Sequence, residues 1–233
     1  MCGIAGVMHR GKTSTVGSEM TTMLKAMKHR GPDSTGFALY QESMPKDQYV
    51  MRFKVAEGSE AQSGFDIQKQ MQDWIQKGDA RLKELDVAVQ KQSQATVYAC
   101  RYEFGFSGSL RELANYIEDL EGVEILSIGK SLELIKDLGD ADNVSETYSL
   151  RGFSGTHAIG HTRMATESDV DIRSAHPYWA YPFSDVSVVH NGQLTNYWTK
   201  RRELERKGHR FMSNCDSELV AVYIADSIDQ GKS

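Results

Sequence analysis

Features that mark special classes of protein are scarce in this sequence of 233 residues. It has three cysteines, Cys2, Cys100 and Cys215, which are too few and too scattered for a disulfide framework. No apolar run approaches the roughly 18–20 residues that a membrane span needs. The N-terminus also lacks the basic residues that open a signal peptide. We therefore expect a protein of the reducing cytoplasm with no membrane segment.

The chain also lacks a strong excess of positive or negative charge. The formal net charge is −5, so the chain carries no electrostatic footprint for nucleic acid. The hydrophobic share of 39% is ordinary for a globular protein, and the chain is long enough to bury a sizeable core. These properties predict one large domain over residues 1–233, or one domain with an inserted lobe.

The first third of the chain predicts strands around one helix. Residues 3–8 are small and apolar and indicate a buried strand. Apolar residues recur at helical spacing over residues 18–28, and Gly31-Pro32 ends that pattern. Residues 37–40 and 49–55 are expected to form paired strands.

The middle of the chain has a different texture and predicts an inserted α+β lobe over residues 60–150. The elements expected in it are a helix over 66–93, a strand over 95–104, a helix over 110–120, a strand over 123–128, a short helix or strand over 132–138, and a linker over 137–146. From residue 156 onward we expect short strands, including 186–189, then a charged helical segment at 200–207 and a final helix that opens at Asp216.

The most informative residue is Cys2. If Met1 is removed, Cys2 carries a thiol and a free α-amine on the same carbon. The unperturbed pKa is ~8.5 for the thiol and ~8 for the α-amine. Modest shifts of these pKa values would give an active nucleophile next to its own base at neutral pH. Position alone, however, favours an ordinary small buried residue.

Other candidate residues have structural explanations when each is taken alone. Asn191-Gly192 follows a β-branched run, as in a hairpin turn, and Asp216 precedes an apolar helix, as an N-cap does. Arg163 would suit a surface ion pair. His157 and His161 stand four residues apart, but Gly160 and the alternating context favour a strand, and no further metal ligands are evident. We predict no metal site.

Taken together, five short segments resemble the motif set of the class II glutamine amidotransferases, the N-terminal-nucleophile glutaminases. They cover roughly residues 1–45 and 155–226, in the family's order. The segments are Cys2-Gly3-Ile4, His29-Arg30-Gly31-Pro32-Asp33-Ser34, Gly160-His161-Thr162-Arg163-Met164-Ala165-Thr166, His190-Asn191-Gly192 and Asp216-Ser217-Glu218.

The resemblance implies a role for each matching residue. Cys2 would attack the side-chain amide of glutamine, with its own α-amine as general base. The side-chain amide of Asn191 and the backbone N–H of Gly192 would hold the oxyanion. Arg163 would bind the substrate carboxylate, with Thr166 nearby, and Asp216 would bind its ammonium. Arg30 and Gly31 would lie on a loop that shapes the pocket, and His176 would be a supporting residue.

The resemblance also implies a fold and a partner. The fold would be α+β, a four-layer αββα sandwich of two antiparallel sheets with the inserted lobe. The chain has no room for a synthase domain, so the ammonia acceptor site is expected on another polypeptide. Within the family it is most similar to the amidotransferase subunit of glutamate synthase-type and N-methylglutamate synthase complexes. Flavin and iron–sulfur centres would then belong only to the partner subunit, with no cofactor on this chain.

Two departures from the family pattern stand out. Met164 replaces the aromatic residue that some relatives have after the arginine. Family members continue past the Asp-Ser-Glu helix with further strands, whereas only residues 227–233 follow here, so we expect a chain truncated at its C-terminus. Two alternatives remain open: a non-catalytic regulatory or structural subunit of the same fold, and an N-terminal-nucleophile hydrolase of another amide.

Overall fold

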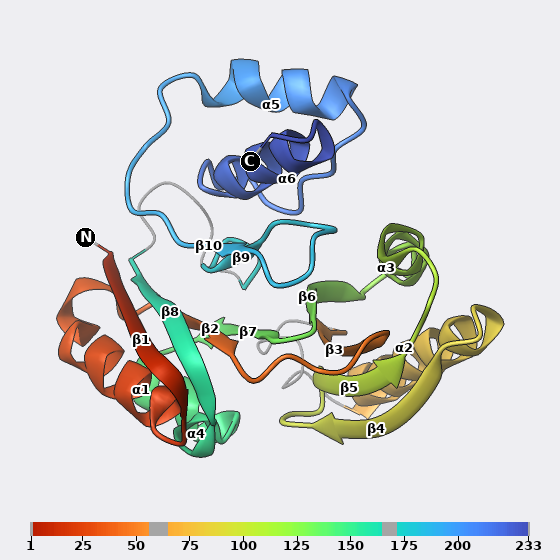
Figure 1. The fold of residues 1–233 in the computed structure, drawn as a ribbon, viewed down its shortest axis with the longest axis horizontal. Coiled ribbons are helices and arrows are strands. Elements are labelled where there is room, and N and C mark those ends of the chain that lie inside the picture. The colour runs from red at the N-terminus through yellow and green to blue at the C-terminus, as the bar shows by residue number, and fades with distance from the viewer. Residues whose placement is uncertain (1, 56–64, 165–171, 233) are drawn as a thin grey trace.

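The computed structural model describes residues 2–55, 65–164 and 172–232, and two four-stranded antiparallel sheets dominate it (Figure 1). The first sheet has the order β1-β8-β2-β7, with the bounds Gly3–Thr13, Gly155–Arg163, Ser34–Tyr40 and Leu132–Leu138. Strand β8 is therefore paired on both sides, with β1 and with β2. This pairing joins the beginning of the chain to a segment more than 150 residues later.

Four layers are built around the first sheet. Side chains alternate along β2, so Phe37 and Leu39 point to one face and Ala38 and Tyr40 to the other. The face of Phe37 packs against α1 (Val16–Ala26) and α4 (Ala141–Thr147). The opposite face meets a small sheet of β9 (Tyr178–Trp179) and β10 (Ser187–Val188), which is covered in turn by α5 (Tyr197–Arg206) and α6 (Glu218–Asp229). The α+β sandwich predicted from the sequence is confirmed.

Helix α1 shows how sequence spacing produces this packing. Val16, Met20 and Leu24 recur every four residues and are fully buried, which places them on one stripe of the helix. The stripe lies on β8, where an ideal Cβ on Gly160 would lie 2.7 Å from Leu24. A glycine at this position lets the helix approach the sheet closely.

The second sheet forms most of a separate lobe. Its order is β4-β5-β3-β6, with the bounds Ala88–Gln94, Ala99–Gly105, Gln48–Lys54 and Glu124–Gly129. Helices α2 (Phe65–Glu84) and α3 (Leu110–Glu118) cover one face, and a large apolar core fills the space between them. The insertion over 60–150 stays a prediction: β3 begins before residue 60, and β7 and α4 belong to the first sheet and its covering layer.

Three local predictions were wrong, and contacts between distant segments explain the first two. Strand β2 pairs with β7 and β8 rather than with β3, because apolar alternation marks a strand without naming its neighbour. The helix expected over 66–93 ends at Glu84, and the polar segment 88–94 is an edge strand on β5. The linker expected at 137–146 contains most of α4. Residues 132–138 form a strand, which is one of the two alternatives that the sequence left open.

Charged residues join the two sheets. Glu133 on β7 accepts hydrogen bonds from Arg52 on β3 and from Arg101 on β5 at 2.8 Å. These residues line an open cleft of about 800 Å³ between the lobe and the first sheet. Burial alone would raise the pKa of Glu133, but the two guanidinium groups outweigh it and hold this pKa below its usual range. None of the helices in the described ranges is long and apolar enough to cross a membrane.

Replacing Glu133 by Gln should lower the free energy of unfolding at pH 7 by about 3 kcal/mol, because the partly buried Arg52 loses its counter-charge and Arg101 keeps only Glu103. Since the folded-state pKa is lowered, the stabilisation is complete above the unfolded-state value of about 4.3 and is lost as the pH falls through the folded value. The difference between wild type and variant should therefore shrink below about pH 4.

Urea denaturation at pH 7 and at pH 3.5 measures both effects. The control is Glu42→Gln, which breaks the exposed pair between Lys12 and Glu42 and should cost less than about 1 kcal/mol. A Glu133→Gln variant as stable as this control would show that Glu133 does not hold the two sheets together.

Candidate functional site

Cys2 lies at the start of the first sheet, beside the end of β8. The residue after it, Gly3, pairs with Thr162, so Arg163 and Met164 emerge next to Cys2. The Cys2 thiol is half-buried, and its Sγ lies 3.8 Å from the carbonyl oxygen of Met164. Strand pairing thus brings the predicted nucleophile to the predicted carboxylate-binding arginine.

Two side chains from distant segments converge on the backbone of Cys2. Arg30 donates from Nε to the Cys2 carbonyl oxygen at 3.2 Å, and Asn191 donates from Nδ2 to the same oxygen at 3.1 Å. Asn191 is exposed, and an ideal Cβ on its neighbour Gly192 would lie 2.9 Å from Nε2 of His190, so a side chain there would require the His190 ring to shift. Three of the predicted segments therefore meet at one residue.

The turn that carries Arg30 is held against β8. Residues Lys28–Arg30 form a single 3-10 turn, and Gly31 follows it with its backbone on the strand. An ideal Cβ on Gly31 would lie 2.6 Å from the backbone nitrogen of Arg163, closer than real side chains approach. The backbone N–H of Asp33 then donates to the Arg163 carbonyl at 3.1 Å. The glycine is needed for this close approach, which places Arg30 near Cys2.

Asp216 is joined to the loop that carries Asn191. Its Oδ2 accepts the backbone N–H of Leu194 at 2.6 Å, and its Oδ1 accepts the hydroxyl of Ser217 at 3.3 Å. The hydroxyl of Ser217 also lies 2.9 Å from Nδ1 of His190. The N-cap of α6 is Ser217 rather than Asp216. Asp216 instead ties the loop that carries Asn191 to the start of this helix.

His176 lies behind the site rather than in contact with Cys2. Its buried ring stacks on that of His161 with centroids 4.2 Å apart, and the edge of Tyr178 meets it at 4.8 Å. Burial lowers the pKa of His161 to about 4, with a further contribution from the charge of Arg163, and lowers that of His176 as well. Both rings are therefore neutral at pH 7. Thr166 lies outside the described residues.

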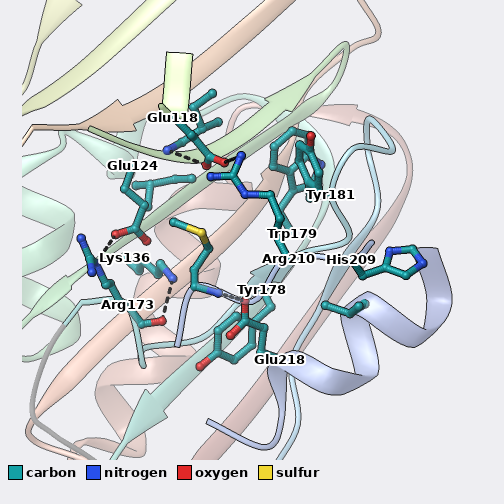
Figure 2. Close-up of a pocket in the computed structure, with 14 residues that line it drawn as sticks. Glu118, Glu124, Lys136, Arg173, Tyr178, Trp179, Tyr181, His209, Arg210 and Glu218 are labelled. Atoms are coloured by element: carbon teal, nitrogen blue, oxygen red, sulfur yellow. Dashed lines mark hydrogen bonds and ion pairs between the residues drawn. The ribbon is translucent and has the colours of Figure 1, made fainter. Parts of the chain in front are cut away.

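Figure 2 shows a small cavity of about 60 Å³ where β6, β7, β9 and α6 meet. The ammonium of Lys136 points into it and donates to the carbonyl oxygens of Arg173 and Ala175 at 3.3 and 3.2 Å. Glu124 pairs with Arg173 across the same space at 3.1 Å. This volume is far below the 300 Å³ or more of typical ligand sites. The cavity instead shows how Lys136 anchors the segment that leads to His176.

Two contacting residues near the site were given no role by the sequence analysis. His161 stacks on His176, and Gly36 lies under the backbone of that residue, where an ideal Cβ would collide with the carbonyl oxygen of His176. His161 occurs inside one motif segment, and Gly36 follows another by two residues. The alternation along β2 places Gly36 on the same face as Ala38, but the segment that covers this face comes from 140 residues later, and no local signal identifies it.

Comparison with known proteins gives the same family by independent means. Residues 161–232 match a family described as a glutamine amidotransferase domain. A putative glutamine amidotransferase of Methanothermobacter thermautotrophicus is 39% identical over 235 aligned positions, which cover all of this chain and 74% of that protein. The glutamine amidotransferase-like protein GlxB of Rhizobium meliloti is 34% identical over all of this chain and 72% of its own length.

A more distant relative shares only part of the chain. Glutamine–fructose-6-phosphate aminotransferase of Gluconobacter oxydans is 35% identical over 123 residues, which cover 53% of this chain and 20% of the relative. The similarity over the full length to the first two relatives decides the assignment. The chain belongs to the glutamine amidotransferases.

Replacing Gly36 by Ala should destabilise the fold by about 2 kcal/mol or more, since the new methyl group must displace the backbone of His176. The matched control is Gly6→Ala on the neighbouring β1, where an ideal Cβ makes only ordinary contacts at 3.7 Å. Thermal unfolding followed by circular dichroism compares the two variants. Equal unfolding midpoints would show that His176 does not pack on Gly36.

Proposed function

We propose that this chain is a class II glutamine amidotransferase that hydrolyses glutamine through a thioester on Cys2. The observation that carries the proposal is the contact of 3.1 Å between the Asn191 side-chain amide and Cys2, which brings an oxyanion donor beside the nucleophile. The half-buried Cys2 thiol lies on the opposite side, against the carbonyl of Met164. Removal of Met1 would free the α-amine that the reaction uses.

The reaction follows from these groups. The α-amine of Cys2 takes the thiol proton, and Sγ attacks the side-chain carbonyl carbon of glutamine. The negative charge that develops on the oxygen is held by Asn191 Nδ2 and the Gly192 backbone N–H. The amine returns its proton to the departing nitrogen, ammonia leaves, and water then hydrolyses the glutamyl thioester to glutamate and free thiol.

Substrate recognition would use the groups around Cys2. Arg163 pairs with the α-carboxylate of glutamine in a forked arrangement, and Asp216 accepts its α-ammonium. Binding both charges separates free glutamine from glutamine within a protein. Gly31 presses its backbone on Arg163, and His176 stacks on His161 two residues before it, so both would support this pocket.

The ammonia would pass to a synthase subunit of the glutamate synthase or N-methylglutamate synthase type. Ammonia released into water at pH 7 is mostly protonated and loses its nucleophilicity, which favours transfer to a bound partner. Flavin and iron–sulfur centres would lie on that partner, and this chain would carry no cofactor. The setting is a reducing cytoplasm, which keeps the Cys2 thiol active.

Incubation with the glutamine analogue 6-diazo-5-oxo-L-norleucine should alkylate Cys2 and no other cysteine, because Cys2 is the cysteine that the proposed oxyanion donor Asn191 contacts. Intact mass spectrometry should show loss of Met1 and one adduct, and excess glutamine should prevent the adduct. The Cys2→Ser variant should remain unlabelled, whereas the Cys215→Ser variant should be labelled like wild type. Labelling of Cys100 or Cys215, or none at all, would refute the proposed nucleophile and favour a non-catalytic subunit.

Replacing Asn191 by Ala should lower kcat for glutamine hydrolysis by about 10²–10³-fold with little change in KM, since the oxyanion loses one of two donors. Asn196→Ala is a matched control, because the Asn196 side chain is exposed and makes no capping hydrogen bond at the start of α5. Steady-state ammonia release measures both. A loss confined to KM would assign Asn191 to substrate binding instead.

A further inference from the structure

Cys2 is held in an unusual way once it is the first residue of the chain. An internal residue is fixed by two peptide bonds, whereas an N-terminal residue has only one. The direction of its thiol and amine therefore depends on how its carbonyl is held. In this structure the Cys2 carbonyl oxygen accepts two side-chain donors, Arg30 Nε at 3.2 Å and Asn191 Nδ2 at 3.1 Å.

The position of Arg30 is itself determined by close packing. Its backbone N–H donates to Met27 at 2.8 Å, and Gly31 behind it rests on the backbone of β8. Met27 in turn crowds Gly3, where an ideal Cβ would lie 2.9 Å from the Met27 sulfur. The turn that carries Arg30 thus packs against both strands that flank Cys2.

Within the described part of the chain, the charge of Arg30 has no counter-ion. Among the described residues, Arg30 forms no ion pair, and its contact with Cys2 is the polar contact that its side chain makes. By contrast, Lys28 on the same turn pairs with Asp140 at 2.7 Å. A guanidinium close to an amine disfavours the protonated amine, because two like charges repel. The amine must be unprotonated to accept the thiol proton.

We propose that Arg30 is a positioning residue for Cys2: it holds the Cys2 carbonyl and keeps the adjacent α-amine in its neutral, basic form. This rests on the proposed glutaminase function, and it replaces the expectation that Arg30 contacts the substrate. Asn191 shares the carbonyl but carries no charge. Arg30 alone therefore keeps the α-amine neutral, whereas Arg30 and Asn191 together hold the Cys2 carbonyl in place.

Several other ionisable groups lie on the elements that pack against Cys2, and all of them remain in the two variants at position 30. They are Arg163 on β8, His190 beside Asn191, and Lys28, His29 and Asp33 on the segment around Arg30. A difference between variants at position 30 therefore reports on Arg30 alone.

The test is the pH dependence of kcat/KM for glutamine in the full chain. Coulomb's law for unit charges about 6 Å apart gives a shift of about half a pH unit even in bulk water. Arg30→Gln should move the acid limb to higher pH by at least that amount and lower kcat, while KM changes less than twofold. Arg30→Lys keeps the charge and should restore the acid limb, but not the full kcat.

The matched control is Lys28→Gln, which removes the same unit charge from the same turn, away from Cys2, and should leave the acid limb in place. An acid limb unchanged in Arg30→Gln, or a rise in KM alone, would overturn the proposal. If Arg30→Gln fails to fold, Arg30→Lys tests the proposal by itself. An acid limb displaced by about half a pH unit in Arg30→Lys would contradict the proposal, because this variant keeps the charge.

Labelling separates this proposal from the proposed function. Wild type that takes up 6-diazo-5-oxo-L-norleucine on Cys2, together with an unchanged acid limb in Arg30→Gln, would reject the role of Arg30 and leave the glutaminase intact. Wild type that takes up no label would reject both.

Discussion

The double pairing of β8 is the constraint on which the site depends. On one side β8 aligns Gly3 with Thr162, so that Cys2 begins the chain beside Arg163 and Met164. On the other side it aligns β2, so that the turn before β2 presses Gly31 onto the same backbone. A strand with hydrogen bonds on both edges is fixed in register, because a shift by one residue would reverse every side chain. The segments that carry Cys2, Arg30 and Arg163 are therefore all positioned by β8.

The layer above this sheet completes the site and shows why buried polar residues recur behind it. The segment through His176 rests on Gly36 and is tied by Lys136, and the loop with Asn191 is tied by Asp216 to the start of α6. The hydrogen bonds of Lys136 and Asp216 each satisfy polar groups that would otherwise be costly to bury. The rings of His161 and His176 stay neutral for the same reason, since burial disfavours a further charge near Arg163.

The lobe is a distinct structural element with a polar interface to the rest of the molecule. Its own core is apolar and lies between its sheet and helices α2 and α3. Its junction with the first sheet is made instead by Glu133 with two arginines and by Asp137 with the hydroxyl of Tyr98 at 2.6 Å. Ionic and hydrogen-bonded contacts require defined geometry, so this junction sets the orientation of the lobe more than it adds stability.

The sequence by itself determined the family, the sandwich class and most helices and strands, because motif order and apolar spacing are local properties. The apolar spacing over residues 18–28 predicts a helix without knowledge of its partner, and Met20 and Leu24 within it lie on the buried face of α1. Only the tertiary structure decided that β2 pairs with β8 rather than β3, that 88–94 is an edge strand, and that Arg30 reaches the carbonyl of Cys2. These facts depend on residues far apart in the chain, whose contacts are chosen by packing of the whole molecule and leave no periodic signal in either segment.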